Sequence, residues 1–165
     1  LRGIGVLAAP AAVVMLAATL PPGVAHGDGS RNLLPPQANK AWQAECGSCH
    51  VAYPPALLPK ASWQKLMGGL DRHFGEDASL DPATRADILR FLEAHAGKDG
   101  KAAPRADANA VPLRITETAW FRHEHDEVPR AAWSRKSIGS AANCAACHRQ
   151  AEQGRYDEGS IRIPK

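Results

Sequence analysis

All four cysteines of this 165-residue chain lie in two copies of one short motif, Cys-x-x-Cys-His. The copies occupy residues 46–50 and 144–148. In this motif the two thiols add to the vinyl groups of a haem, and the adjacent histidine supplies an axial ligand to the iron. Two copies therefore predict two covalently bound c-type haems. The expected attachment residues and proximal ligands are Cys46, Cys49, Cys144, Cys147, His50 and His148.

Paired cysteines have three other common roles, namely two disulfides, a redox-active dithiol, or one zinc site built from all four thiolates. A zinc site would draw its ligands from two pairs separated by most of the chain, and it would leave both adjacent histidines unexplained. A thioredoxin-like dithiol would stand in a βαβ pattern, which the sequence lacks. Haem attachment explains the histidines together with the thiols, and it is the favoured interpretation.

Each iron also has a sixth position, and its occupant decides between electron transfer and chemistry on a small molecule. Methionine is disfavoured, because the only methionine outside the N-terminal apolar segment is Met67, which falls in an apolar stripe typical of a helix core. His26 lies within the N-terminal segment. The histidines that remain as candidates are His73, His95, His123 and His125.

Helical periodicity separates these candidates only in part. His73 lies on the same face as Leu66 and Leu70, and His95 stands in the same relation to the apolar residues of its own helix. A histidine near a helix C-terminus also interacts favourably with the helix dipole, so His95 is interpreted as a structural or surface residue.

In the second half the periodicity discriminates between two neighbouring histidines. At 100° per residue, His125 points about 50° away from the mean direction of Phe121 and Val128, whereas His123 points about 150° away. This favours His125 as a ligand, with His123 as the competing imidazole.

The elements that must position these residues are mainly helical, because strand patterns are nearly absent. Asp81 is the expected N-cap of one helix, with Pro82 at its first position. The sequence predicts helices running into Cys46, over residues 62–74, 81–97, 118–128 and 141–153, and an extended tail over residues 160–164. The fold class is therefore mainly α.

The chain divides into a signal peptide over residues 1–27, an N-terminal c-type haem domain over 28–103 and a C-terminal c-type haem domain over 104–165. The signal peptide is predicted from an apolar run followed by small residues. The run is shorter than the ~20 residues that span a bilayer and contains Pro10, which disfavours an uncleaved membrane anchor. A polar, glycine-containing linker is expected over residues 97–107.

Composition limits the function further. The chain is 44% hydrophobic and 22% charged, which is typical of a globular protein and excludes a disordered one. Aromatic residues amount to only 5%, so the haems are expected to fill part of the interior. The four tryptophans are expected to pack against the haems, and the alternative is that they form ordinary core. The carbonyls of the loop 52–55 are candidate partners for an axial imidazole. A net charge of +3 is too small to indicate nucleic-acid binding.

From Trp42 to Pro164 the sequence resembles the small dihaem cytochromes c that donate electrons to an oxygen-binding monohaem cytochrome of the sphaeroides haem protein type. The resemblance rests on both haem motifs and on residues 53–55, 57–59, 63, 73–75, 114–118 and 124–125.

This resemblance implies an N-terminal domain similar to a class I cytochrome c and a small C-terminal domain that is organised by its haem and has little regular structure. It also implies two bis-histidine haems. On the family's pattern, His73 corresponds to the distal ligand of the first haem and His125 to that of the second, with His123 as an additional imidazole in this sequence.

Two haems with both axial positions filled would pass single electrons without binding a substrate. The expected function is that of a periplasmic, low-potential one-electron carrier, not an enzyme, because bis-histidine ligation favours a lower potential than methionine–histidine ligation. The expected acceptor is a small exported monohaem cytochrome, and the donor is membrane-bound or soluble. The alternatives are a dihaem peroxidase and a haem-based gas-binding or sensor protein. Each needs one open iron, and Glu124 beside His125 is the only suggestive acid–base group.

Overall fold

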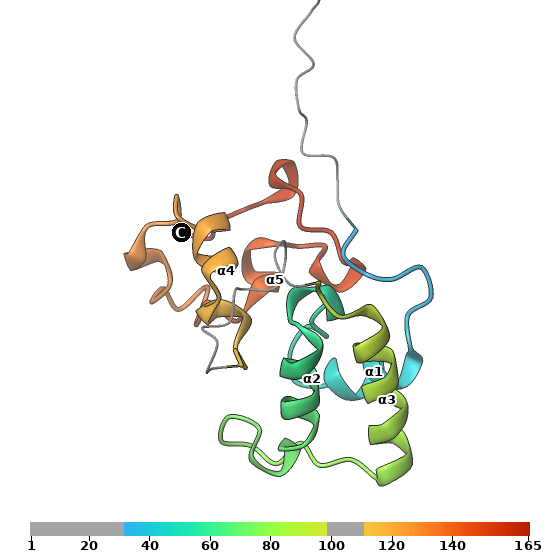
Figure 1. The fold of residues 1–165 in the computed structure, drawn as a ribbon. Helices are drawn as coiled ribbons and strands as arrows, with labels where there is room; N and C mark the ends of the chain where they lie inside the picture. Colours follow the sequence, from blue (N-terminus) through green and yellow to red (C-terminus); the bar gives the residue numbers. More distant parts are fainter. Residues whose placement is uncertain (1–31, 99–110) are drawn as a thin grey trace, which may run out of the picture.

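The computed structural model describes residues 32–98 and 111–165, which form short helices and turns of 3-10 helix (Figure 1). In chain order the elements are α1 (Lys40–Cys46), η1 (Pro55–Leu57), α2 (Lys60–Met67), η2 (Leu70–Arg72), α3 (Pro82–His95), η3 (Ile115–Glu117), α4 (Ala119–Glu124), η4 (Arg130–Ala132), α5 (Cys144–Cys147), η5 (Ala151–Gln153) and η6 (Glu158–Ser160). The only β pairing in these two ranges consists of isolated bridges. The mainly α fold class is thereby confirmed.

Two expected segments fall outside the described residues. These are the signal peptide over 1–27 and most of the linker over 97–107, together with the domain boundary after residue 103. Within the described ranges, no helix has both the length and the apolar character needed to cross a membrane.

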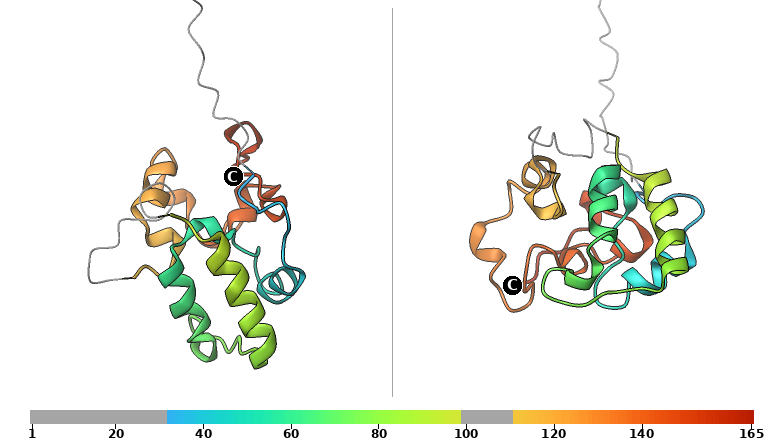
Figure 2. Two further views of the ribbon diagram at one scale, coloured as in Figure 1. Left: turned by 45° about the vertical axis from the view of Figure 1, so that its right-hand side comes forward. Right: turned by 60° about the horizontal axis from the view of Figure 1, so that its bottom comes forward.

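The three helices of the first half pack around a common core. Helices α2 and α3 lie side by side, and α1 packs on α3 (Figures 1 and 2). The side chains that these helices and η1 bury are Trp42, Leu57, Leu58, Trp63, Met67, Ile88, Phe91 and Leu92. Met67 thus has the core role that its apolar stripe predicted. Burial of these apolar surfaces, more than helix propensity, holds such short helices in place.

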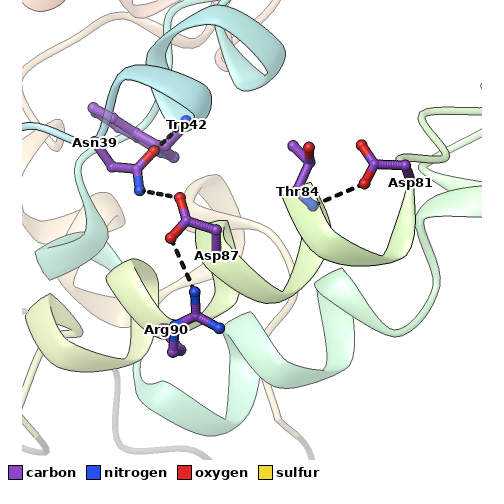
Figure 3. Close-up of polar contacts among 6 residues, drawn as sticks. All are labelled: Asn39, Trp42, Asp81, Thr84, Asp87 and Arg90. Atoms are coloured by element: carbon purple, nitrogen blue, oxygen red, sulfur yellow. Dashed lines mark hydrogen bonds and ion pairs between the residues drawn. The ribbon is translucent and has the colours of Figure 1, made fainter.

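Polar caps fix where two of these helices begin, as Figure 3 shows. The Asp81 carboxylate accepts the backbone N–H of Thr84 at 3.0 Å, which confirms the predicted N-cap of α3. The Asn39 side chain accepts the N–H of Trp42 at 2.8 Å and donates to Asp87 at 2.7 Å. Asn39 therefore starts α1 and ties it to α3.

The second helix is shorter than the sequence predicted. The expected helix over residues 62–74 ends at Met67, because Gly68 and Gly69 follow and two consecutive glycines are unfavourable in a helix. The chain then makes the single turn η2, and His73 lies in the loop beyond it. The apolar periodicity therefore placed His73 in the wrong element, and its role as a distal ligand stays a prediction.

The helices of the second half are also shorter than predicted. The expected helix over 118–128 is α4, which begins after Thr118, whose hydroxyl accepts the N–H of Phe121 at 3.0 Å, and ends before His125. Of the expected helix over 141–153 only α5 and the turn η5 form. Residues 161–165 form no helix or strand. The second half thus has little regular structure, because its small and polar residues offer no apolar face long enough to hold a helix.

The two halves are joined by packing and by backbone pairing. Ile115 and Phe121 of the second half belong to the same buried cluster as the core of the first. Near the start of the described chain, the N–H of Leu33 donates to the carbonyl of Gly154 at 2.9 Å. Gly154 has a φ of 73°, and a side chain there would collide with Leu34, so the contact requires glycine.

Gly97, expected as the first residue of the linker, belongs to the first half instead. Its N–H donates to the carbonyl of Leu58 at 2.9 Å, and a Cβ atom at this position would collide with the carbonyl of Ala56. The prediction that the linker begins at Gly97 is therefore wrong, because glycine is needed here for a close backbone approach.

Candidate haem sites

The first cysteine motif forms the end of α1 and the turn that follows. Cys46 is the last residue of the helix, and Cys49 and His50 follow in the turn. The imidazole of His50 faces that of His73, with 6.4 Å between the ring centres and 27° between the ring planes. A helix end and the loop after η2 therefore bring together the two histidines predicted for the first haem.

The orientation of His50 is fixed by its own neighbourhood. Its Nδ1–H donates to the carbonyl of Val51 at 2.8 Å, which leaves Nε2 as the nitrogen available for a metal. The expected partner was a carbonyl of the loop 52–55, and this detail of the prediction is wrong. Within that loop the carbonyl of Pro55 instead accepts the indole N–H of Trp63 at 2.8 Å.

The second motif forms the single helical turn α5, with His148 as its C-cap residue. The ring of His148 lies 6.1 Å from that of His125, and the two ring planes are 82° apart. The Nδ1–H of His125 donates to the carbonyl of Phe121 at 2.9 Å, and its ring stacks on the Phe121 ring at 4.0 Å. The residue immediately after α4 thus faces the residue immediately after α5.

The other candidate histidines lie elsewhere. His123, on α4, is exposed, and it is His125 that faces His148. His95 is the exposed last residue of α3, with its ring 5.0 Å from that of Phe91, as expected for a structural or surface residue. The assignment of iron ligands remains a prediction, but the structure pairs the residues chosen from the sequence.

One histidine of each facing pair has a lowered pKa. Burial lowers the pKa of His73, and the nearby charges of His50 and Arg114 lower it further. Burial likewise lowers the pKa of His148, with a further decrease from His125 and an opposing effect from Asp157. Both histidines therefore favour the neutral imidazole, which is the form that binds metals.

The spacing of both pairs suits an iron between them. Two metal–imidazole bonds of about 2 Å, with about 1 Å from each nitrogen to its ring centre, place the ring centres roughly 6 Å apart.

At the second site, His148 Nδ1 and Tyr156 Oη are buried without a hydrogen-bond partner in the described part of the chain. Buried polar atoms are nearly always hydrogen-bonded, so a further polar group is expected to complete this site.

Two tyrosines beside the proximal histidines were missed at the sequence level. The ring of Tyr53 stacks on His50 at 4.6 Å, and its hydroxyl donates to the carbonyl of Ala142 in the other half at 2.7 Å. Burial raises the pKa of Tyr53 to about 12, so the hydroxyl stays protonated as a donor. The ring of Tyr156 lies 5.1 Å from that of His148. The available signal was that the chain has only two tyrosines, each shortly after a haem motif.

The tryptophans divide between the core and the second site. Trp42 and Trp63 are buried in the core cluster, with Trp42 packed 5.2 Å from Phe91. Trp133 is only partly buried, and its ring lies 5.8 Å from that of His125. Trp42 and Trp63 thus have a core role, and Trp120 packs, partly buried, against the same cluster. The packing of the four tryptophans on the haems stays a prediction, and Trp133 lies beside a predicted ligand.

None of the four cysteines is joined to another as a disulfide. Over residues 32–98 and 111–165, no three or more histidine, cysteine, aspartate or glutamate side chains gather in a way that could hold a metal ion by themselves. Each half of the chain places a pair of thiols beside a pair of facing histidines. These two arrangements define a protein with two c-type haem sites.

The comparison with protein families agrees with this class. The model of the family described as dihaem cytochrome c matches residues 42–156, and the chain belongs to this family. It is accordingly a dihaem cytochrome c of electron transport, with two covalently bound c-type haems.

Solved structures support the same assignment. The chain is similar to the dihaem cytochrome c from Rhodobacter sphaeroides, with 44% identity and a TM-score of 0.67 over 72% of this chain and 97% of that one. It is also similar to a dihaem cytochrome c from Shewanella baltica, with 41% identity and a TM-score of 0.66 over 76% of this chain and 93% of that one. None of the curated proteins compared with the chain matches it.

Proposed function

We propose that this protein is a periplasmic, low-potential one-electron carrier with two bis-histidine haems, and not an enzyme. The observation that carries the proposal is the facing of His50 with His73 and of His125 with His148, at 6.4 and 6.1 Å between ring centres. These four imidazoles would supply the axial ligands of two irons. An iron with both positions filled exchanges electrons but binds no substrate.

In this proposal Cys46 and Cys49 attach the first haem, and Cys144 and Cys147 attach the second. When bound, the haems supply one-electron chemistry at iron. The protein's own contribution is to hold the imidazoles in place through the Val51 carbonyl at His50 and the Phe121 carbonyl at His125. Such hydrogen bonds fix the tautomer and make the ligating nitrogen more basic. Together with bis-histidine ligation they favour a low reduction potential.

The proposed location and partners follow from the same chemistry. Cells attach c-type haem outside the cytoplasmic membrane, and the signal peptide predicted over residues 1–27 supports export to the periplasm. The proposed acceptor is a small monohaem c-type cytochrome, and the proposed donor is a membrane-bound or soluble reductant. Transfer through an exposed haem edge needs only a small and transient interface.

The different ring-plane angles predict two different electron paramagnetic resonance signals from the oxidised protein. At 27° two imidazoles that bind one iron would interact with nearly the same d orbital, and the first site should then give a rhombic low-spin signal. At 82° they would interact with different d orbitals of nearly equal energy, and the second site should then give a strongly anisotropic low-spin signal. Two identical rhombic signals would contradict the assignment by angle, and a stoichiometric high-spin signal would contradict bis-histidine ligation.

The function is tested by mixing the reduced protein with an oxidised monohaem cytochrome c in a stopped-flow instrument, beside an assay of hydrogen peroxide turnover. We expect rapid reduction of the cytochrome and little peroxide turnover, because neither iron has an open position. Fast peroxide reduction with slow cytochrome reduction would favour the dihaem peroxidase instead. Rapid carbon monoxide binding by the reduced protein would favour a gas-binding protein.

A further inference from the structure

Phe74, which directly follows His73, has a strained backbone. Its φ is 56°, and every other described residue with a positive φ is a glycine. A bulky side chain in this left-handed region is unfavourable, because its Cβ atom crowds the following carbonyl oxygen. Phe74 is also 45% exposed, so burial of its ring does not explain the conformation. Strain of this kind persists only where surrounding contacts hold it, and it often marks a functional position.

Backbone hydrogen bonds hold the loop on both sides of the strained residue. The N–H of Phe74 donates to the carbonyl of Arg72 at 2.8 Å. The N–H of His73 donates to the carbonyl of Glu76 at 2.8 Å, and the N–H of Glu76 donates back to the carbonyl of His73 at 3.2 Å. His73 is therefore held in a tight turn whose geometry depends on the conformation of Phe74.

The ring of Phe74 lies between His73 and a cation from the other half of the chain. It meets the His73 imidazole at 4.9 Å between ring centres, with 60° between the planes. The guanidinium of Arg114 lies 3.9 Å from the centre of the same ring. A cation at this distance from an aromatic ring is attracted by the electrons of the ring face.

Arg114 is itself anchored in the second half. Its carbonyl accepts the N–H of Glu117 at 3.1 Å, and its side chain forms an ion pair with the Glu117 carboxylate at 3.6 Å. The next residue, Ile115, is buried in the shared core. The position of the guanidinium is thus fixed by the residues around η3, not by the loop that carries His73.

We propose that Arg114 and Phe74 form a clamp, defined by these two residues, that keeps His73 turned toward His50. The clamp rests on the proposed bis-histidine ligation of the first haem. Arg114 is a positioning residue, because its guanidinium contacts the ring of Phe74, and that ring in turn contacts His73. Through this contact the second half of the chain helps to keep the first iron closed.

The test measures how fast carbon monoxide binds to the reduced, haem-loaded protein, since it binds the first iron only after His73 has left. Replacement Arg114→Ala should raise this rate about fivefold at one of the two haems. Replacement Arg114→Lys keeps the cation and should restore most of the slow binding. Phe74→Ala, which removes the ring but leaves a Cβ atom at this position, should raise the rate at least as much as Arg114→Ala.

Arg72→Ala is the matched control, because Arg72 is an exposed arginine of the same loop and pairs with Asp71 at 3.2 Å. It should leave the rate unchanged. In the Arg114→Ala protein, the rhombic resonance signal should broaden while the anisotropic signal stays the same. An unchanged rate in Arg114→Ala, or an equal rise in Arg72→Ala, would overturn the clamp. If the unaltered protein already binds carbon monoxide rapidly, it is the proposed ligation that fails.

Discussion

Replacement of His125 by alanine should open one of the two irons. His125 faces His148 at 6.1 Å, and its side chain is the imidazole proposed to close the second haem. Its loss should convert about half of the total haem to a high-spin form that binds carbon monoxide, because each haem is half of the population. Optical spectroscopy of the reduced protein with and without carbon monoxide measures this fraction. The anisotropic resonance signal should disappear in the same variant, while the rhombic signal remains.

His123→Ala is the matched control, because it removes an exposed imidazole from α4 only two residues away. It should leave both haems low-spin. His73→Ala should open the first iron in the same way, with His95→Ala as its control. A high-spin haem in His123→Ala but not in His125→Ala would show that the competing histidine is the ligand.

Removal of the second haem should unfold the second half of the chain before the first. The double replacement Cys144→Ser and Cys147→Ser removes both attachment points, and α5 is only a single helical turn. A few hundred Å² of apolar porphyrin surface, at about 25 cal/mol per Å², contributes several kcal/mol that the sparse side-chain core of this half lacks. The mass of the purified variant should fall by one haem. Limited proteolysis should then cut first within residues 111–165.

The matched variant carries Cys46→Ser and Cys49→Ser. It loses the other haem, but α2 and α3 still bury Trp63, Met67 and Leu92 against each other. This variant should therefore expose residues 111–165 less than the second-site variant does. Unchanged helicity and protease resistance in the second-site variant would contradict a folding role for the haem.

The roles of the cysteine motifs and the N-cap of α3 were the features most readily predicted from the sequence. The start of α3 follows from Asp81 and Pro82, because a cap is a local interaction between neighbouring residues. The choice of His125 over His123 followed from helical geometry, although His125 lies just beyond the end of α4. His125 lies in the turn that directly continues α4, so its side chain points close to the direction that a longer helix would give it.

The features that escaped prediction are a local signal that was overridden by periodicity and several features without a local signal. Periodicity continued the second helix through Gly68 and Gly69, because an apolar stripe carries no information about where the backbone turns away. The stacking of Tyr53 on His50, and the bond from its hydroxyl to Ala142, join residues that the sequence separates by almost ninety positions. The strained backbone of Phe74 has no local sequence signal either, since glycine would be the expected residue there.

The bond between Leu33 and Gly154 has a consequence for the order in which the chain can fold. Leu33 precedes the first haem motif, whereas Gly154 follows the second, so a chain that crosses the membrane with its N-terminal part first presents one partner well before the other. Contacts between such distant residues close a large loop, and they slow folding relative to local contacts. The three helices of the first half use mostly nearby residues and are not subject to this delay. The first haem domain can therefore assemble early, while Leu33 stays unpaired until the segment that follows the second haem motif is available.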